Sequence, residues 1–410
     1  MNRIDTLIVG SGQAGLAVSY FLSQEGREHL VLEKAEHPAN AWRNDRWDSF
    51  TLVTPNWSFR LPGSEYAEAD PHGYMPRAEI VARFERHIER HRPPVRFGVC
   101  VLSVSRDDPG YRVETSQGLW HADNVVIATG LYQAPKIPAF SRGLPAHILQ
   151  LHTSKYRNPD SLPPGAVLVA GSGQSGCQIA EELYQAGRVV YLCMGSAGRV
   201  PRRYRGRDIV EWLDLTGFLG RTPDKLPSLQ KRFASNPLVT GKDGGHTLNL
   251  HQFYRDGVTL LGRLSGANDG KVILAPDLKE NLAKMDELET NIVKMVDEYI
   301  AKAGLEAPED TLPVLRDAYG ATEILELDLA KAGVSTIIWA MGYNFDFSLV
   351  KMAEMDEFGF PVTKGGFTRH AGLYFAGLPW LDSQRTGILL GVGEHARAIA
   401  AQIVGKRIPL

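Results

Sequence analysis

The chain has 410 residues, enough for about two or three domains, and its 43% hydrophobic and 22% charged residues exclude a disordered or coiled-coil protein. A net charge of −2 argues against nucleic-acid and anionic-membrane partners, and no apolar run approaches the ~20 residues of a membrane span. Three cysteines exclude a disulfide scaffold and a Cys-rich zinc module, so we expect no metal site, while 41 glycines, one residue in ten, indicate many tight turns or backbone pressed against ligands.

The first predicted unit is a strand, a glycine turn, a helix and a second strand. The apolar run 4–9 begins close to the N-terminus without the features of a signal peptide, so we expect a cytoplasmic protein. GSGQAG follows, and its glycines let the backbone approach a pyrophosphate at the start of the helix. The second strand ends on a carboxylate that can accept both ribose hydroxyls of an adenosine. The expected contacts are Gly10, Gly12, Gln13, Ala14, Gly15, Glu33 and Lys34.

A second copy of this unit follows without gaps at an offset of 161 residues, with GSGQSG as its turn. Two in-frame copies, each between apolar runs, make ordinary glycine turns an improbable explanation. Met194 replaces the carboxylate, and arginines follow it, which favours the 2′-phosphate of NADP here and FAD in the first site. A solvated basic loop or a nucleic-acid patch is the alternative. The expected contacts are Gly171, Ser172, Gly173, Gln174, Ser175, Gly176, Arg199 and Arg203.

Two apolar runs that each end in glycine mark where the chain is expected to pass between domains. DNVVIATG ends at Thr129 and Gly130, and its near-copy STIIWAMG is followed by Tyr343 after Gly342. Ordinary buried strands are the alternative. We predict an α/β fold with two Rossmann-like dinucleotide-binding domains, the second inserted into the first. The predicted FAD domain spans 1–157 and 336–410, and the predicted NADP domain spans 158–335.

Two further elements are expected inside the second domain. The sequence around Asn268, Asp269 and Gly270 predicts a hairpin turn between two short strands. Residues 277–303 carry apolar side chains at three- and four-residue steps, which predicts one amphipathic helix. Such a stripe is usually core, and the alternatives are a cap over a substrate entrance or the face of a homodimer.

These motifs resemble those of the class B flavoprotein monooxygenases, which include flavin-containing monooxygenases, YUCCA enzymes and Baeyer–Villiger enzymes. The segments WRNDRWDSFTLVTPNWSFRLPG, LQLHTSKYRNP, PRRYRGRDIVEWL and GLYFAGLPWLDSQRTGILLGVGEHA extend the resemblance over nearly the whole chain. It is similar above all to bacterial flavoproteins labelled as involved in cation efflux or potassium transport. The resemblance implies an enzyme in which NADPH reduces FAD and O2 then forms a flavin C4a-(hydro)peroxide. That species would oxygenate N or S in a small organic substrate, or decarboxylate an α-keto acid oxidatively.

The resemblance also implies particular residues. The family fingerprint FxGxxxHxxx(Y/F or W) is matched by His152 and Tyr156, whereas its Phe and Gly are replaced. In the family this segment lies where the domains meet and influences nicotinamide chemistry, so both residues are catalytic candidates. Asn56 is a third, near the position of an Asn beside the flavin, and a turn Asn is the alternative. Further cofactor contacts are expected at Trp42, Arg43, Thr54, Val101, Thr129, Gly130, Gly342, Tyr343, Gly377, Gly387, Ile388 and Leu389.

Three other functions share this plan of two dinucleotide sites. A disulfide reductase needs a cysteine pair beside the flavin, and the positions of Cys100, Cys177 and Cys193 exclude one. An NADPH dehydrogenase that passes electrons to a quinone or protein acceptor remains an alternative. A redox-sensing regulatory flavoprotein with a protein partner is a second alternative.

Overall fold

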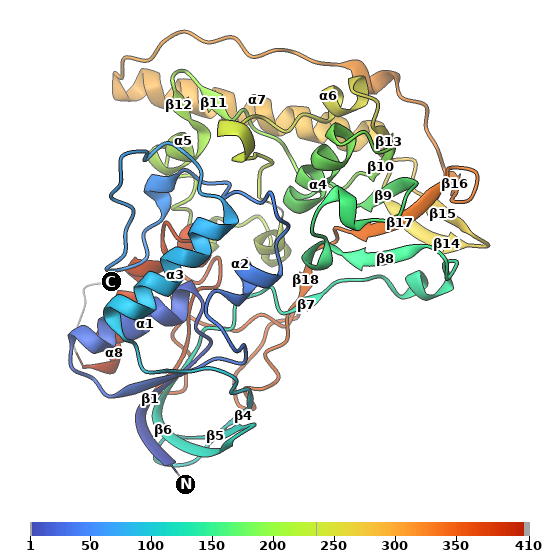
Figure 1. Ribbon diagram of the computed structural model, residues 1–410. Coiled ribbons are helices and arrows are strands. Elements are labelled where there is room, and N and C mark those ends of the chain that lie inside the picture. The colour runs from blue at the N-terminus through green and yellow to red at the C-terminus, as the bar shows by residue number, and fades with distance from the viewer. Residues whose placement is uncertain (1, 235, 406–410) are drawn as a thin grey trace.

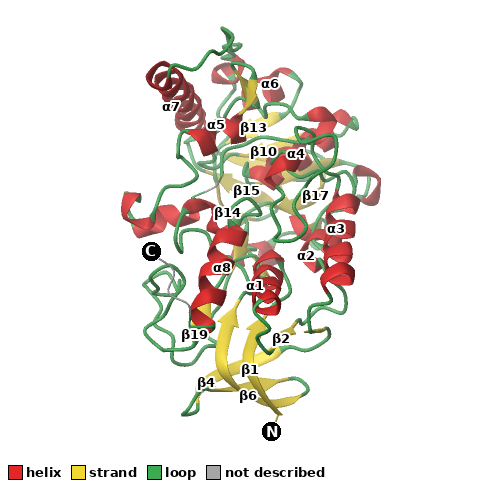
Figure 2. Cartoon of the chain, turned by 90° about the vertical axis from the view of Figure 1, so that its left-hand side faces the viewer, coloured by secondary structure: helices red, strands yellow, loops and turns green. Residues whose placement is uncertain are grey.

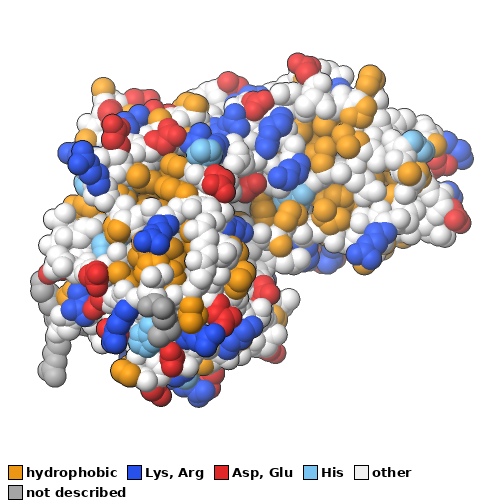
Figure 3. Space-filling view, turned by 60° about the horizontal axis from the view of Figure 1, so that its bottom comes forward, with side chains coloured by type: hydrophobic (Ala, Val, Ile, Leu, Met, Phe, Trp, Pro, Cys, Tyr) orange, Lys and Arg blue, Asp and Glu red, His pale blue; other side chains and the backbone are white. Residues whose placement is uncertain are grey.

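The computed structural model of the protein describes residues 2–234 and 236–405. The chain forms two lobes, one around a seven-stranded sheet and the other around a five-stranded sheet (Figure 1). On the face drawn in Figure 3, basic and acidic side chains are interspersed and are not gathered into one basic area. None of the helices in the described ranges has both the length and the hydropathy of a membrane-crossing segment.

The first lobe is built on the sheet β3-β2-β1-β6-β5-β4, with β19 also paired to β6. β1 runs parallel to β2 and β6, and its last four residues are buried, as in central strands of parallel sheets. Helices α1 and α8 lie side by side over this sheet (Figure 2). The bounds are β1 Asn2–Val9, β2 His29–Leu32, β3 Val95–Arg96, β4 Val101–Arg106, β5 Tyr111–Thr115, β6 Gly118–Ile127, β19 Leu373–Phe375, α1 Gln13–Gln24, α2 Asn40–Asn44, α3 Arg77–His91 and α8 Val392–Ile403.

The second lobe repeats this plan with the parallel sheet β13-β10-β9-β17-β8. Its central trio β10-β9-β17 corresponds to β2-β1-β6, and α4 follows β9 as α1 follows β1. The prediction of two Rossmann-like domains is confirmed. The bounds are β8 Leu149–His152, β9 Ala166–Ala170, β10 Val190–Cys193, β11 Arg203–Tyr204, β12 Arg207–Asp208, β13 Thr259–Leu261, β14 Leu264–Asn268, β15 Lys271–Leu274, β16 Glu326–Asp328, β17 Val334–Trp339, α4 Gln174–Gln185, α5 Ile209–Leu215, α6 Leu250–Arg255 and α7 Leu278–Ala303.

The predicted domain boundaries need correction at both ends of the insertion. The predicted FAD domain includes β8, but β8 pairs in parallel with β17 as the edge strand of the second sheet. β17 likewise lies wholly in the second sheet. The links between lobes are β7 (Ala134–Pro135) and β18 (Tyr343–Asn344), which pair with each other in antiparallel fashion. The chain therefore leaves and re-enters the first lobe through one two-stranded connection.

The two elements predicted inside the second lobe are confirmed. β14 and β15 form a hairpin whose turn residues Asp269 and Gly270 have φ values of +48° and +75°. α7 begins at Leu278 and ends at Ala303. Its apolar side chains are buried in two core clusters, which supports the core interpretation of the stripe: Leu278, Leu282, Met285, Ile292, Val296 and Ile300.

Candidate functional site

The first glycine turn, residues 10–15, connects β1 to α1. Gly10 has a φ of +102°, and a Cβ there would lie 2.7 Å from the carbonyl oxygen of Ala128. A Cβ on Gly15 would lie 1.9 Å from the carbonyl oxygen of Gly10. A Cβ on Gly12, at the start of α1, would meet nothing within 4 Å. This open space beside unpaired helix N–H groups fits the pyrophosphate of a dinucleotide.

The second glycine turn, residues 171–176, has the same geometry. Gly171 has a φ of +117°, and a Cβ there would lie 2.6 Å from the carbonyl oxygen of Ala340. A Cβ on Gly176 would lie 1.9 Å from the carbonyl oxygen of Gly171, and one on Gly173 would meet nothing within 4 Å. Ala128 directly follows β6 and Ala340 directly follows β17, just before the predicted Thr129, Gly130 and Gly342. The segment after each of these strands therefore lies against a glycine turn in the same way in both copies.

The carboxylate after the second strand separates the two copies. Glu33 accepts hydrogen bonds from the backbone N–H of Ser11 (2.8 Å) and from its hydroxyl (3.0 Å), so the carboxylate lies beside the first turn. In the second copy Met194 is buried, and the hydroxyl of Ser172 instead accepts a hydrogen bond from the N–H of Gly195 (2.9 Å). The first site can bind ribose hydroxyls through a carboxylate, and the second cannot.

The two turns each carry a glutamine that reaches a distant segment. Gln13 donates a hydrogen bond to the carbonyl oxygen of Gly387 (2.8 Å), which brings the turn before α8 to the first site. Gly377 packs there as well, because a Cβ on it would lie 2.2 Å from Cβ of Ala14. Gln174 donates to the carbonyl oxygen of Val239 and accepts from its N–H (3.3 Å). The side-chain amide of Gln174, expected to contact NADP, is thus occupied by a segment that crosses the second turn.

Of the two arginines predicted for the 2′-phosphate, Arg199 needs a correction. Arg199 is only 3% exposed and forms ion pairs with Asp286 and Glu289 of α7, so its guanidinium is not available to a phosphate. Arg203 has no carboxylate partner among the described residues and donates to the carbonyl oxygens of Gly244 (2.7 Å) and Gly245 (2.9 Å). The neighbouring arginines are paired internally: Arg202 with Asp208, Arg205 with Asp297, and Arg207 with Glu211.

His152 lies at the junction of the lobes, as predicted. It is buried, its ring lies edge-on to that of Tyr343 with 4.7 Å between centroids, and Nε2 donates to the carbonyl oxygen of Gly342 (2.9 Å). Nδ1 accepts from the hydroxyl of Ser154 (3.0 Å). Burial lowers the pKa of His152, so the imidazole is neutral near pH 7. His152 therefore fixes the returning strand β18 to the linker that leads into the second lobe.

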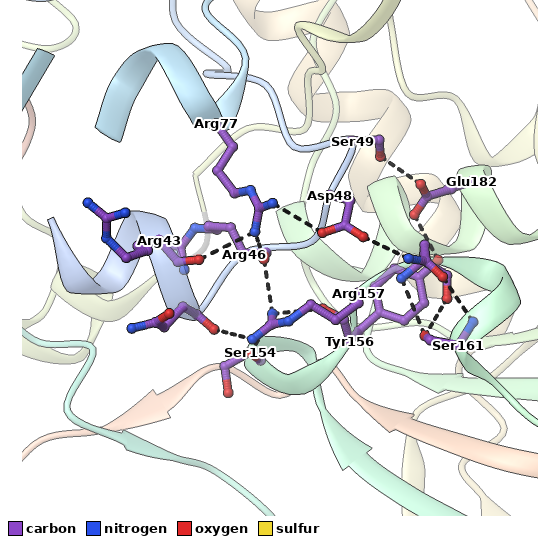
Figure 4. Close-up of polar contacts among 12 residues, drawn as sticks. Arg43, Arg46, Asp48, Ser49, Arg77, Ser154, Tyr156, Arg157, Ser161 and Glu182 are labelled. Carbon is purple, nitrogen blue, oxygen red and sulfur yellow. Dashed lines mark hydrogen bonds and ion pairs between the residues drawn. The ribbon is translucent and has the colours of Figure 1, made fainter. Parts of the chain in front are cut away.

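The catalytic role predicted for Tyr156 needs a correction. The side chain is fully buried, and its hydroxyl donates to the carboxylate of Glu182 on α4 (2.7 Å). Burial and this carboxylate raise the pKa of Tyr156 well above its usual range. Ser49 of the first lobe donates to the other oxygen of Glu182 (2.7 Å), as Figure 4 shows. Tyr156 therefore forms a structural hydrogen bond within the second lobe, between the segment that follows β8 and helix α4.

Two residues of this junction were missed from the sequence. The guanidinium of Arg157 donates to the carbonyl oxygens of Arg46 (3.0 Å), Ser154 (3.2 Å) and Tyr156 (3.1 Å), which ties the loop after α2 to the linker (Figure 4). Glu182 was missed as well. The repeat contained a signal for it, because Glu182 falls on an aromatic residue of the first copy, and a charge in that place needs a partner.

Asn56 is 5% exposed and lies in the loop that precedes α3. Its Nδ2 donates to the carbonyl oxygen of Asp70 (2.9 Å), and its N–H donates to that of Gly73 (2.9 Å). Oδ1 is buried and has no partner among the described residues. A buried acceptor of this kind fits a donor from a bound ligand.

The remaining predicted contacts have only local partners among the described residues. Arg43 on α2 forms an ion pair with Glu85, and Trp42 beside it packs against the core. Thr54 accepts a hydrogen bond from the hydroxyl of Ser58 (2.7 Å). The others are the buried Leu389, the half-buried Val101, Ser175 and Ile388, and the exposed Lys34.

Comparison with known proteins agrees with this geometry. The family model described as pyridine nucleotide-disulphide oxidoreductase matches residues 7–210. The chain is 30% identical over 403 residues, 98% of either chain, to a Geobacillus kaustophilus protein named "Uncharacterized oxidoreductase CzcO-like". It is 30% identical over 184 residues to rice indole-3-pyruvate monooxygenase YUCCA1, covering 44% of this chain and 45% of that one. A flavin-containing monooxygenase from Stenotrophomonas maltophilia has the same fold, with a TM-score of 0.67 at 18% identity over 99% of either chain.

The chain belongs to the class B flavin monooxygenase superfamily. It is an oxidoreductase, and the cofactors of this superfamily are FAD and NADP(H). Each glycine turn has two glycines at which a Cβ would clash and a middle glycine with open space around it. Both turns therefore fit the pyrophosphate of a dinucleotide.

The superfamily shares its fold with disulfide oxidoreductases, so the thiols are informative. Cys177 is buried in α4 and donates to the carbonyl oxygen of Ser172 (3.2 Å), and burial raises its pKa above the usual range. Burial raises the pKa of Cys193 to about 12. Cys100 is half-buried and lies just before β4. The two buried thiols are therefore protonated, and thiolates are the form that attacks disulfides.

Proposed function

We propose that the protein is an FAD- and NADPH-dependent monooxygenase that transfers one oxygen atom of O2 to a small organic molecule. FAD occupies the turn at residues 10–15 and NADP(H) the turn at residues 171–176. The observation that carries the proposal is the pairing of two dinucleotide turns with the burial of Cys177 and Cys193, which leaves half-buried Cys100 without a second accessible thiol for a redox relay. Electrons that enter through NADPH then need a diffusible acceptor, and O2 is the one the superfamily uses.

When bound, the reduced flavin supplies the activation of O2. The residues of the chain position the cofactors and control charge. Glu33 holds the adenosine ribose, and the N-termini of α1 and α4 stabilise the two pyrophosphates. Neutral His152 keeps β18 against the linker, which sets the second turn relative to the first. The buried acceptor of Asn56 is available to a hydrogen-bond donor of the flavin or the substrate.

Arg203 remains the proposed contact for the 2′-phosphate. Its guanidinium is exposed and uses only main-chain carbonyl oxygens, so a phosphate would supply its missing negative partner. Arg203→Ala is expected to raise the Michaelis constant for NADPH about tenfold while sparing NADH. A preference of the unmodified protein for NADH would contradict this assignment.

The test of the function combines a substrate screen with an isotope. Amines, thioethers and α-keto acids are tested for stimulation of NADPH oxidation, and products formed under 18O2 are analysed by mass spectrometry. Incorporation of one 18O atom into N- or S-oxidised products, or into the acid left by decarboxylation, supports the proposal. Unlabelled products together with rapid anaerobic reduction of menadione would instead identify an NADPH dehydrogenase.

A further inference from the structure

Arg221, in the loop after α5, has no carboxylate partner among the described residues. Arg221 donates through Nε to the carbonyl oxygen of Phe218 (2.9 Å) and through Nη2 to Oε1 of Gln384 (2.8 Å). No carboxylate among the described residues lies within ion-pair distance of it. Several other arginines of this part of the chain are paired with carboxylates, namely Arg199, Arg202, Arg205, Arg207 and Arg232, and so is Arg385.

The guanidinium of Arg221 lies near two aromatic rings. Its Cζ lies 3.6 Å from the ring centroid of Phe218 and 5.7 Å from that of Trp380. Trp380 is a non-glycine residue at a φ of +64°, a conformation that costs energy and that the structure keeps through a hydrogen bond from its N–H to the carbonyl oxygen of Ser383 (2.9 Å). Apolar ring surface thus lies beside the guanidinium, and partial burial lowers the pKa of Arg221.

Arg221 also lies close to the first dinucleotide turn. Its carbonyl oxygen accepts from the N–H of Gln384 (2.9 Å), and that of Leu219 accepts from the N–H of Arg385 (3.1 Å). The loop after α5 is therefore docked on the turn that precedes α8. Three residues beyond Gln384, the carbonyl oxygen of Gly387 accepts the hydrogen bond from Gln13. A cation of the second lobe is thereby placed against the flavin-binding lobe.

We propose that Arg221 binds the carboxylate of the substrate, and that the substrate class is a small organic acid with an apolar or aromatic body. This inference rests on the proposed function and specifies its substrate. A desolvated cation without a counter-ion is costly, and the planar guanidinium matches a carboxylate with two parallel hydrogen bonds. Phe218 and Trp380 supply apolar surface for the rest of the molecule.

The experiment measures binding to the FAD-loaded protein by calorimetry, with indole-3-acetate and indole-3-acetamide as probes of matched shape. The acid is expected to bind about tenfold or more tightly than the amide. Arg221→Gln should weaken acid binding by about 10–100-fold and leave the amide within about twofold. Arg221→Lys should keep part of the preference, because it keeps the charge but not the bidentate geometry.

The matched control is Arg397→Gln. Arg397 on α8 also lies over an aromatic ring, 5.0 Å from the centroid of Phe21, and is exposed without a carboxylate partner among the described residues. It should not affect either probe. FAD content and the melting temperature of each variant show whether the fold is intact.

Three results would overturn the proposal: equal affinity for acid and amide, no millimolar binding of the acid to the unmodified protein, or an Arg221→Gln effect confined to NADP+. The last would make Arg221 a cofactor contact. If the protein binds the acid selectively but incorporates no 18O into products, the proposed monooxygenase activity is wrong. The proposed carboxylate-binding site at Arg221 would still be supported.

Discussion

The two βαβ units have the same turn and different helices. The Gly10–Gly15 and Gly171–Gly176 pairs make the same close contacts, because a Cβ on the last glycine of each pair would lie 1.9 Å from the carbonyl oxygen of the first. On the following helix, Tyr20 and Phe21 of α1 are replaced by Glu181 and Glu182 of α4. The aromatic pair packs within its own lobe, whereas the two carboxylates reach His246, Ser49 and Tyr156. The two turns thus have the same binding geometry, and the lobes differ in the side chains that the following helix presents to its neighbours.

The largest effects are expected at the glycines that the two turns share. Gly15→Ala should destabilise the first lobe by about 1–3 kcal/mol or more and abolish FAD retention, because the new Cβ overlaps a carbonyl oxygen. Gly176→Ala should abolish NADP+ binding while FAD stays bound. Flavin absorbance after gel filtration and NADP+ calorimetry separate the two outcomes. Loss of FAD from both variants would show that the two lobes do not bind their cofactors independently.

A control comes from the open glycine of the same turn. Gly12 has an ordinary φ of −70° and free space around its Cβ position. Gly12→Ala should therefore preserve the melting temperature of the apoprotein and weaken FAD binding alone, since the methyl group takes up space near the pyrophosphate.

The next largest effect is expected at the position after the second strand of each unit, where Glu33 in the first copy corresponds to Met194 in the second. Glu33→Gln should raise the dissociation constant of FAD by about 10–100-fold, because charged hydrogen bonds to the ribose are lost. The reverse change, Met194→Glu, should move the second site from NADPH toward NADH. Fluorescence titration with FAD and Michaelis constants for both nicotinamides measure the pair. If the Met194→Glu variant keeps its preference for NADPH, the side chain at position 194 does not determine the choice between NADPH and NADH.

Elements governed by local pattern were predictable, and this includes the chemistry of both turns. Glycine spacing and apolar runs determined both βαβ units, and the 268–270 turn and the apolar stripe of α7 follow from hairpin and helix periodicity. Each of these depends on residues within a few positions of one another. The edge strand β8 was misplaced because its partner β17 lies about 185 residues further along the chain.

Side-chain partners could not be predicted in the same way. Arg199 looked like a phosphate ligand because its carboxylate partners, Asp286 and Glu289, lie on a helix nearly 90 residues further on. Tyr156 matched a fingerprint, yet its role depends on Glu182 in the second lobe. A local run shows that a cation is present, and only the fold shows whether its charge is already paired.

A smaller effect is expected at the junction. Tyr156→Phe leaves one oxygen of half-buried Glu182 without its donor, so the free energy of unfolding should fall by about 1–3 kcal/mol. Affinity for NADP+ should fall with it, because Glu182 lies on the helix that begins at the second turn. The matched control, Tyr20→Phe, removes a hydroxyl that has no hydrogen-bond partner among the described residues. Equal urea midpoints for the two variants would contradict a stabilising role of the Tyr156–Glu182 hydrogen bond.

The smallest effect is a pH dependence at Glu181, the residue of α4 that precedes Glu182. The hydrogen bond to buried Glu181 (2.7 Å) raises the pKa of His246 above its ordinary value, although burial opposes this. A raised folded-state pKa means that the stabilisation is complete below about pH 6.5 and is lost as the pH rises through the folded value. Because His246 is 37% exposed, its contribution should stay below about 1 kcal/mol. Urea unfolding of the unmodified protein and His246→Gln should therefore differ most at pH 6 and converge toward pH 9. If the difference in unfolding free energy instead grows with pH, Glu181 binds the neutral imidazole better than the charged one. The stabilisation by His246 would then come from burial and not from charge.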